Sequence, residues 1–447
     1  MKPRIGIRLE DMYAWERRTP LTPDDARRLQ TEEGLEIVVQ SSAKRAYTDD
    51  EYRSAGIPVV ESLDDCPLII GIKEIPNEHL AADKNYVYFS HTIKGQPYNM
   101  EMLQRLLDLN CTLIDYERIV DEEGRRLIFF GNFAGLAGMI DTLWALGQRL
   151  DHQGIRTPFA EVRRALDYKD LDDAKTDIAR IGDAIRTNGL PEGIAPLVIG
   201  VAGYGNVSKG AQEILDLLPV EPIKPEELPG IHASSRLSRK VVGKVVFEER
   251  HMAMPADPGQ AFDLQTYYSH PERFRGRFEA FLDELDVLVN CIYWEPRYPR
   301  LVTREQLRDR LESGALRLKV IGDITCDIEG SIEATVRATE PDNPVYVFDP
   351  RTGEAVDGVE GEGTVVMAVE ILPTELPRES SSFFSRILAG LLPGLARADL
   401  HEPIEKSGLP PELQRAVICH RGRLAPAYTY LQEHLKQHAT STKEGVN

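Results

Sequence analysis

The stretch LVIGVAGYGNVSKGAQEIL, residues 197–215, decides the fold. Its apolar run, residues 197–202, leads into a glycine turn, and apolar side chains then recur at helical spacing. In such a strand–turn–helix unit, Gly203 permits the tight turn and Gly205 lets the backbone approach a pyrophosphate at the helix N-terminus. The segment therefore predicts an α/β domain that binds a dinucleotide.

The glycine fingerprint is incomplete, because Ser208 stands where a third glycine is usual and Gly210 follows two residues later. The acidic residue expected about 20 residues after the turn is Glu221, which would favour NAD through the ribose hydroxyls. The residues that would instead hold a 2′-phosphate are Ser234, Ser235, Arg236, Arg239 and Lys240, so the choice between NAD and NADP stays open. The turn residues expected to contact the cofactor are Gly203, Gly205, Asn206, Val207 and Ser208.

Outward from this turn, short apolar runs alternate with amphipathic runs, as in α/β domains with parallel sheets. Thr48 and Glu51 form a capping box, and Pro23 follows Thr22 as a first helical residue. Before the turn, strands are expected at residues 4–9, 35–40, 67–73, 86–92 and 112–118, and helices at 22–33, 48–55, 98–109 and 133–150. From the turn onward, strands are expected at 197–202, 245–247, 287–293 and 318–321, with a helix at 303–311.

The expected fold class is α/β, with two Rossmann-like, doubly wound parallel-sheet domains separated by a cleft and linked by long helices. Residues 1–135 and about 350–447 are expected to form a catalytic, substrate-binding domain. Residues 136–349 are expected to form the dinucleotide-binding domain.

The composition excludes several classes of protein. A net charge of −19 repels nucleic-acid phosphates and anionic lipids, so neither nucleic acid nor membrane is an expected partner. The N-terminal residues lack the apolar region of a signal peptide, and no apolar run is long enough to span a membrane. The five cysteines have neither metal-ligand nor disulfide spacing, which predicts reduced thiols, no metal site and a cytoplasmic protein.

Two further segments, Ile72-Lys73-Glu74 and Ser90-His91-Thr92, each end an apolar strand, where open α/β sheets place ligand-contacting groups. A buried lysine can act as a base and a histidine titrates near neutrality, so this pair could move the protons that imine chemistry requires. The alternative is a surface lysine and a hydrogen-bonded core histidine. In the loop after the first strand, Arg17 and Arg18 could clamp a substrate carboxylate, although a loop arginine is usually solvated.

Together these segments resemble the superfamily of alanine dehydrogenases, transhydrogenases and saccharopine dehydrogenases. The resemblance is closest to the lysine-ketoglutarate reductase part of the bifunctional alpha-aminoadipic semialdehyde synthase, and it runs nearly end to end. Stretches that carry it include AWERRTPLTP, IIGIKEIP, FSHTIKGQPYNM, FGNFAGLAGMI, GYGNVSKGAQEI, IYWEPRYPRLVTREQ, DITCDIEGSIE and VEGEGTVVMAVEILPTELP.

The resemblance implies NADPH-dependent condensation of the lysine ε-amine with 2-oxoglutarate, followed by hydride delivery to the imine to give saccharopine. It implies that Lys73 and His91 are the acid–base pair, and that Glu74 and Glu117 tune the lysine. It also implies that Arg18 binds a substrate carboxylate, and that Asp323 lies near the nicotinamide and the substrate.

Two other functions remain open. An alanine dehydrogenase-like enzyme would aminate a small 2-oxoacid with ammonia, and a non-catalytic regulator would only bind NAD(P); the segment IYWEPRYPRL favours the lysine branch. The chain ends at Asn447 without the saccharopine-oxidising part of the bifunctional enzyme. The expected partners are therefore lysine, 2-oxoglutarate, saccharopine and a separate saccharopine-oxidising enzyme, while the direction of reaction and assembly as a homo-oligomer stay open.

Overall fold

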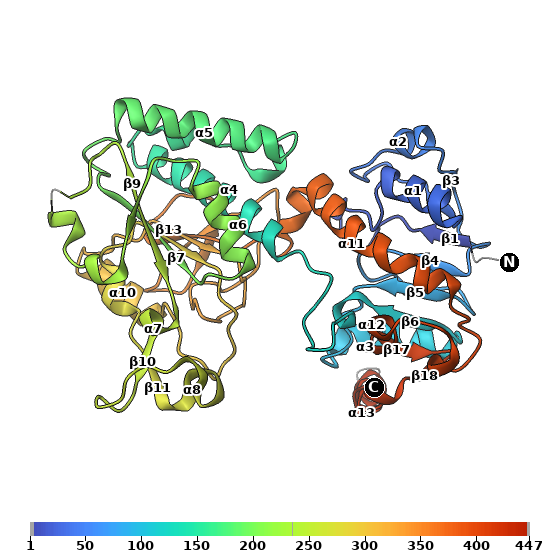
Figure 1. Ribbon diagram of the computed structural model, residues 1–447. Coiled ribbons are helices and arrows are strands. Elements are labelled where there is room, and N and C mark those ends of the chain that lie inside the picture. Colours follow the sequence, from blue (N-terminus) through green and yellow to red (C-terminus); the bar gives the residue numbers. More distant parts are fainter. Residues whose placement is uncertain (1–3, 235, 445–447) are drawn as a thin grey trace. The chain divides into compact units, whose positions relative to one another are not determined.

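The computed structural model describes residues 4–234 and 236–444, and the chain forms two compact units. Unit 1 comprises Met1–Phe130 and Pro377–Asn447, and unit 2 comprises Gly131–Leu376. Each unit contains one eight-stranded sheet flanked by helices (Figure 1). The expected α/β class with two Rossmann-like sheets is confirmed.

Unit 1 is a mainly parallel sheet with strand order β18-β17-β6-β5-β4-β1-β2-β3, in which β17 runs antiparallel to β6. Its strands are β1 (Arg4–Ile7), β2 (Glu36–Gln40), β3 (Val59–Val60), β4 (Leu68–Ile70), β5 (Asn85–Tyr88), β6 (Thr112–Asp115), β17 (Val417–His420) and β18 (Arg423–Leu424). Its helices are α1 (Pro23–Glu33), α2 (Asp49–Ser54), α3 (Pro97–Asp108), α11 (Pro377–Arg397), α12 (Pro411–Arg415) and α13 (Leu431–Glu444).

Local signals in the sequence set the helix ends of unit 1. The Thr22 side chain caps α1 by accepting a hydrogen bond from the Asp25 backbone, and the capping box of Thr48 and Glu51 starts α2 as predicted. Helix α11 packs against α1, so the C-terminal segment completes the core that the first 130 residues begin.

Unit 2 has the strand order β15-β14-β16-β13-β12-β7-β9-β8. Its strands are β7 (Leu197–Ala202), β8 (Val220–Ile223), β9 (Val242–Phe247), β12 (Val287–Asn290), β13 (Val320–Asp323), β14 (Val345–Phe348), β15 (Ala355–Asp357) and β16 (Thr364–Met367), with a separate pair β10 (Ala253–Pro255) and β11 (Phe274–Gly276). Its helices are α4 (Gly131–His152), α5 (Leu171–Asn188), α6 (Asn206–Leu215), α7 (Glu249–Met252), α8 (Leu264–Ser269), α9 (Glu279–Leu282) and α10 (Arg304–Glu312).

The chain leaves unit 2 later than the sequence suggested. A boundary at about residue 350 would have cut its sheet, because β16 pairs in parallel with β13 and antiparallel with β14. Residues 351–376 therefore belong with the glycine turn, and only the segment from α11 onward returns to unit 1.

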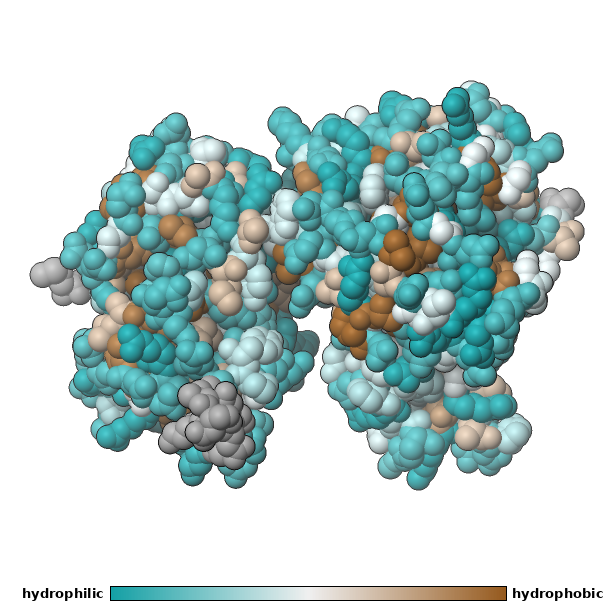
Figure 2. All heavy atoms as spheres, turned by 180° about the vertical axis from the view of Figure 1, so that it is seen from behind, coloured by the Kyte–Doolittle hydropathy of each residue, from teal (hydrophilic) through white to brown (hydrophobic). Residues whose placement is uncertain are grey.

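The surface is largely polar. The face drawn in Figure 2 is mostly hydrophilic, with hydrophobic residues in separate patches. Within residues 4–234 and 236–444, no helix combines the length and the apolar character that crossing a membrane requires. Of the large hydrophobic residues that are exposed, Tyr204, Tyr268 and Tyr293 line one pocket of unit 2, which is described below.

Two buried carboxyl groups interact inside unit 2, Asp141 on α4 and Glu375 at the end of the unit. Burial raises the pKa of Asp141, and burial followed by the Asp141 charge raises the pKa of Glu375 well above its ordinary range. The folded chain therefore holds protons here that the unfolded chain releases above about pH 4. The free energy of unfolding consequently falls as the pH rises from about 4 through the raised pKa values of Asp141 and Glu375.

We expect Glu375→Gln to stabilise unit 2 at pH 8 by roughly 1–2 kcal/mol, because the amide needs no proton to be neutral. The midpoint of thermal unfolding should rise by a few degrees at pH 8, and the gain should shrink at pH 5. Glu370→Gln, an exposed neighbour, is the control and should change neither value. A gain that is equal at both pH values would show that Glu375 is not held protonated in the folded protein.

Candidate functional site

Four neighbouring strands of unit 1 carry ionisable side chains beyond their carboxyl ends. Strands β6, β5, β4 and β1 lie side by side and parallel, so the residues that follow them meet at one edge of the sheet. These residues are Glu10, Glu16 and Arg18 after β1, Lys73 and Glu74 after β4, His91 after β5, and Asp115 and Glu117 at the end of β6.

His91 and Glu74 form a hydrogen bond in this cluster, between Nδ1 and Oε1. The Glu74 side chain is 4% exposed and that of His91 is 34% exposed. Burial acts to raise the pKa of Glu74, but the hydrogen bond and charge of His91, together with the Lys73 charge, outweigh it and lower that pKa. Glu74 is therefore a carboxylate that accepts a hydrogen bond from His91 Nδ1–H, and Nε2 is the ring nitrogen that this contact leaves available.

The backbone at His91 is unusual, since its φ of 48° lies in the left-handed region that few histidines adopt. The Asn99 amide donates to the His91 carbonyl at 3.1 Å and holds this conformation. Strain of this kind, of order 1–3 kcal/mol, persists where the surroundings fix a functional side chain.

Lys73 is positioned by Glu10, a residue that the sequence reading did not single out. The Glu10 carboxylate accepts from the backbone N–H groups of Ile72 at 2.6 Å and Lys73 at 3.0 Å. The Lys73 Nζ lies 5.4 Å from the Tyr13 ring centroid. Burial, followed by the Glu16 charge, raises the pKa of Glu10 to about 7. Glu10 thus titrates near neutrality beside Lys73; its place after the first strand was the signal that could have identified it.

Arg18 is buried in an ion pair with Glu16. Its Nε donates to Glu16 Oε1 at 2.8 Å and its Nη2 donates to Oε2 at 2.5 Å, while its Cζ lies 4.3 Å from the Phe130 ring centroid. Burial acts to raise the pKa of Glu16, but the charge and hydrogen bonds of Arg18 lower it. Because Glu16 occupies one edge of the guanidinium, a substrate carboxylate would have to use the Nη1 side. Arg17, by contrast, is exposed.

Asp115 joins the ends of β5 and β6 below His91. Its carboxylate accepts from the Ser90 backbone at 3.2 Å, from the Ser90 hydroxyl and from the Glu117 backbone at 2.8 Å. Burial raises the pKa of Asp115 to about 6. The Glu117 side chain pairs with Arg126, so the structure pairs it with an arginine where the sequence led us to expect the lysine.

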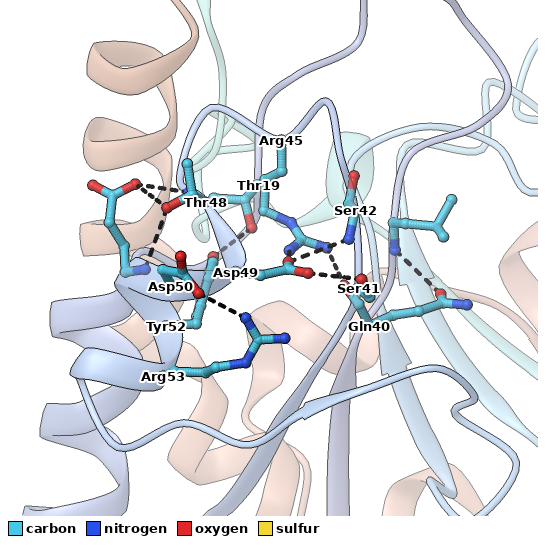
Figure 3. Close-up of polar contacts among 12 residues, drawn as sticks. Thr19, Gln40, Ser41, Ser42, Arg45, Thr48, Asp49, Asp50, Tyr52 and Arg53 are labelled. Atoms are coloured by element: carbon cyan, nitrogen blue, oxygen red, sulfur yellow. Dashed lines mark hydrogen bonds and ion pairs between the residues drawn. The ribbon is translucent and has the colours of Figure 1, made fainter.

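Figure 3 shows a polar network in the connection between β2 and α2, which reaches Thr19 in the loop between β1 and α1. The Tyr52 hydroxyl donates to the Leu21 carbonyl at 2.5 Å and lies 3.0 Å from Thr19 Oγ1. The buried Arg45 guanidinium donates to Asp49 at 3.2 Å and to the Gln40 carbonyl. Through Tyr52, the β2–α2 segment therefore holds the loop between β1 and α1, which carries Glu16 and Arg18.

We expect Arg45→Ala to lower the free energy of unfolding of unit 1 by about 3 kcal/mol, because it removes a buried guanidinium that donates to the Gln40 carbonyl and leaves Asp49 with only Ser41 and Ser42 as donors. Arg53→Ala is the control, since the Arg53–Asp50 pair within α2 (Figure 3) is exposed. It should cost about 0.5 kcal/mol or less. Equal costs in urea denaturation would contradict the assigned role of Arg45.

In unit 2 the glycine turn borders a pocket of about 330 Å³. Gly203 has a φ of 97°, and its N–H donates to the Phe247 carbonyl at 2.9 Å. A Cβ on Gly205 would have no protein atom of the described structure within 4 Å, so the turn leaves open space beside the N-terminus of α6. Asn206, Val207 and Ser208 form the first turn of that helix, and Ser208 is buried. Besides the glycine turn and Glu249, the pocket lining is Met252, Tyr267, Tyr268, Cys291, Ile292, Tyr293, Trp294 and Tyr298.

This pocket has two features of a dinucleotide site. The open space at Gly205 admits a pyrophosphate to the helix N-terminus, and the aromatic side chains offer flat surfaces to its rings.

The residues predicted to choose between NAD and NADP lie elsewhere. Glu221 is exposed on the edge strand β8, opposite Gly243, and β9 separates that strand from β7. Arg236 pairs with Glu227 at 3.1 Å, and Ser235 lies outside the described residues. Ser234, Arg236, Arg239, Lys240 and Glu221 are all absent from the pocket lining among the described residues. The prediction for Glu221 is wrong because β8, the first strand after the glycine turn, is the edge strand. The next strand, β9, is the one that pairs with β7.

Asp323 ends β13 and is 1% exposed. It accepts from the Thr335 hydroxyl at 2.5 Å, from the Asn290 amide at 2.8 Å and from the Cys326 backbone at 3.3 Å. Burial raises its pKa to about 6. These contacts brace the ends of β12 and β13, and Asp323 is not among the described residues that line the pocket at the glycine turn.

Comparison with known proteins finds several that are similar to this chain. Residues 6–137 match the family model "Alanine dehydrogenase/PNT, N-terminal domain". The chain is 41% identical to the alpha-aminoadipic semialdehyde synthase of Arabidopsis thaliana over 457 residues, covering 99% of this chain and 42% of the relative. It is 25% identical to the saccharopine dehydrogenase (NAD(+), L-lysine-forming) of Emericella nidulans over 399 residues, covering 86% of this chain and 90% of the relative.

The fold agrees with these relationships. A solved L-alanine dehydrogenase superposes with a TM-score of 0.61 at 18% identity, covering 97% of this chain and 99% of that one. The chain spans 42–49% of the length of the four synthases that it matches. By sequence the chain is thus similar over nearly its whole length to part of the alpha-aminoadipic semialdehyde synthases, and its residues 6–137 match the alanine dehydrogenase/PNT N-terminal domain.

Proposed function

We propose that the protein is a nicotinamide-dependent oxidoreductase that forms or cleaves saccharopine by reductive condensation of L-lysine and 2-oxoglutarate. The observation that carries the proposal is the cluster of Lys73, Glu74 and His91 at neighbouring strand ends, in a chain homologous to alpha-aminoadipic semialdehyde synthases. The saccharopine dehydrogenases among its relatives support the same substrate class.

The cluster suits the proton transfers of imine formation. The ε-amine of the substrate must be neutral to attack the 2-oxo carbon, so a base has to remove its proton. We assign this step to the unprotonated amine form of Lys73, whose backbone N–H donates to Glu10. The carbinolamine oxygen must then gain a proton and leave as water, and His91 Nε2 is the donor in its protonated form. Glu74 stabilises that form through the Nδ1 hydrogen bond.

A bound nicotinamide would supply the hydride that reduces the imine. We assign its binding to the glycine turn, with the pyrophosphate beside Gly205 and the α6 N-terminus. The overall reaction consumes lysine, 2-oxoglutarate, one reduced dinucleotide and one proton. It yields saccharopine, the oxidised dinucleotide and water.

The test is a steady-state assay that follows oxidation of NADH and of NADPH with two substrate pairs. We expect turnover with lysine plus 2-oxoglutarate and at least a hundredfold less with pyruvate plus ammonia. Turnover only with the second pair would replace the proposal by an alanine dehydrogenase-like activity. Binding of a dinucleotide without turnover of either pair would favour a non-catalytic regulator.

A further inference from the structure

The order of strands in unit 2 decides which acidic side chain meets the ribose of a bound dinucleotide. Strand β9, not β8, lies next to β7, with Ala202 opposite Phe247. Because Gly203 N–H donates to the Phe247 carbonyl, the carboxyl end of β9 adjoins the glycine turn directly. The two residues after Phe247 are Glu248 and Glu249.

These two carboxylates have different surroundings. Glu248 pairs with Arg250 at 3.0 Å and is not part of the pocket lining. Glu249 lines the pocket together with Gly203 and Gly205. Only the second carboxylate is therefore placed to contact a dinucleotide.

Two tyrosines hold the Glu249 carboxylate in place. Its Oε1 accepts from the Tyr268 hydroxyl at 2.6 Å and from the Tyr204 hydroxyl at 3.4 Å. Burial, followed by the Glu249 carboxylate, raises the pKa of both tyrosines, so both hydroxyls stay protonated and donate. Both bonds use the same oxygen, and a carboxylate accepts at two oxygens. Oε2 can therefore accept from a further donor.

We propose that Glu249 accepts hydrogen bonds from the adenosine ribose hydroxyls and makes this protein prefer NAD(H) over NADP(H). The inference rests on dinucleotide binding at the glycine turn, which is one part of the proposed function. In α/β dinucleotide-binding domains an acidic residue beside the glycine turn binds the ribose diol, whereas a 2′-phosphate is accommodated by an arginine.

The charge of the pocket also favours NAD(H) over NADP(H). Among the described residues, no lysine, arginine or histidine lines it, and Arg250 is engaged by Glu248. A 2′-phosphate would bring a charge of about −2 against the Glu249 carboxylate in a protein whose net charge is −19. We expect NADPH to bind on the order of 100-fold more weakly than NADH.

The experiment measures dissociation constants of NADH and NADPH for the full chain by direct titration, for example through quenching of Trp294, which lines the pocket. Glu249→Ser should weaken NADH binding about tenfold and bring the two constants within a few-fold of each other. Glu248→Ser is the matched control and should leave the ratio as in the wild type. If Glu249→Ser does not fold, Glu249→Gln removes the charge with little change of shape and should also narrow the ratio.

A wild-type preference for NADPH, or a ratio that Glu249→Ser and Glu249→Gln leave unchanged, would overturn the proposal. Binding constants require no turnover, so the result is independent of the substrate assay. A protein that prefers NADH but forms no saccharopine would retain this inference and lose the proposed function. A protein that forms saccharopine but does not prefer NADH would retain the proposed function and lose the role of Glu249.

Discussion

Replacing His91 by alanine is expected to lower turnover by a factor of about 10²–10⁴, the usual contribution of a general acid or base. The side chain is the partner of Glu74 and the proton donor that we assign to departure of water from the carbinolamine. Lys73→Met should cause a loss of similar size, because the methionine keeps the length of the side chain and removes the amine. Both variants should keep their affinity for the dinucleotide, because both residues belong to unit 1 and the glycine turn to unit 2.

The matched control is His79→Ala, a 54% exposed histidine side chain of the same unit. It should retain full turnover. Stopped-flow or steady-state assays with lysine and 2-oxoglutarate, combined with a dinucleotide titration, separate the two readouts. A parallel loss of turnover and dinucleotide affinity in His91→Ala would show that the division of roles between the units is wrong.

Gly205→Ala is expected to weaken dinucleotide binding about 100-fold without destabilising the protein, since a methyl group there would fill the space that a pyrophosphate needs. The backbone of Gly205 has φ −74° and ψ −166°, which alanine adopts, and no protein atom of the described structure lies within 4 Å of the added carbon. The folded protein therefore has room for the alanine side chain, but the added methyl group would occupy the space that the bound pyrophosphate needs.

Gly210→Ala is expected to have the opposite effect: it should destabilise the protein without weakening dinucleotide binding. A Cβ at Gly210 would lie 2.2 Å from the Asn132 carbonyl oxygen, where α6 packs against α4 (Figure 1). We expect this variant to lose about 1–3 kcal/mol of stability and to keep its dinucleotide affinity in the folded fraction. Thermal unfolding and direct titration of both variants test the pair. Unchanged affinity in Gly205→Ala would place the dinucleotide elsewhere.

Much of this molecule is predictable from local sequence. The strand–turn–helix at Gly203, the capping box at Thr48 and the alternation of apolar and amphipathic runs depend on neighbouring residues. The strand ends that carry Lys73 and His91 follow from the same alternation, because parallel strands share one carboxyl edge.

The errors concern pairing between distant segments. Glu221 occupies the expected distance along the chain, but β9 takes the position beside β7 and brings Glu249 to the turn instead. The late return of the chain to unit 1 also depends on pairing, because β16 needs β13 as its neighbour. Periodicity along the chain contains no information on which strand or charge becomes the partner.

The proposed reaction is tested most directly by tracing the hydride. The protein would be incubated with L-lysine, 2-oxoglutarate and reduced dinucleotide carrying deuterium at both C4 positions, and the products analysed by mass spectrometry. We predict saccharopine with one deuterium on the carbon that was the 2-oxo carbon, no such product when either substrate is omitted, and almost none from Lys73→Met. A parallel incubation would contain pyruvate and ammonia in place of lysine and 2-oxoglutarate. Deuterated alanine in that incubation, with no labelled saccharopine in the first, would contradict the proposed reaction.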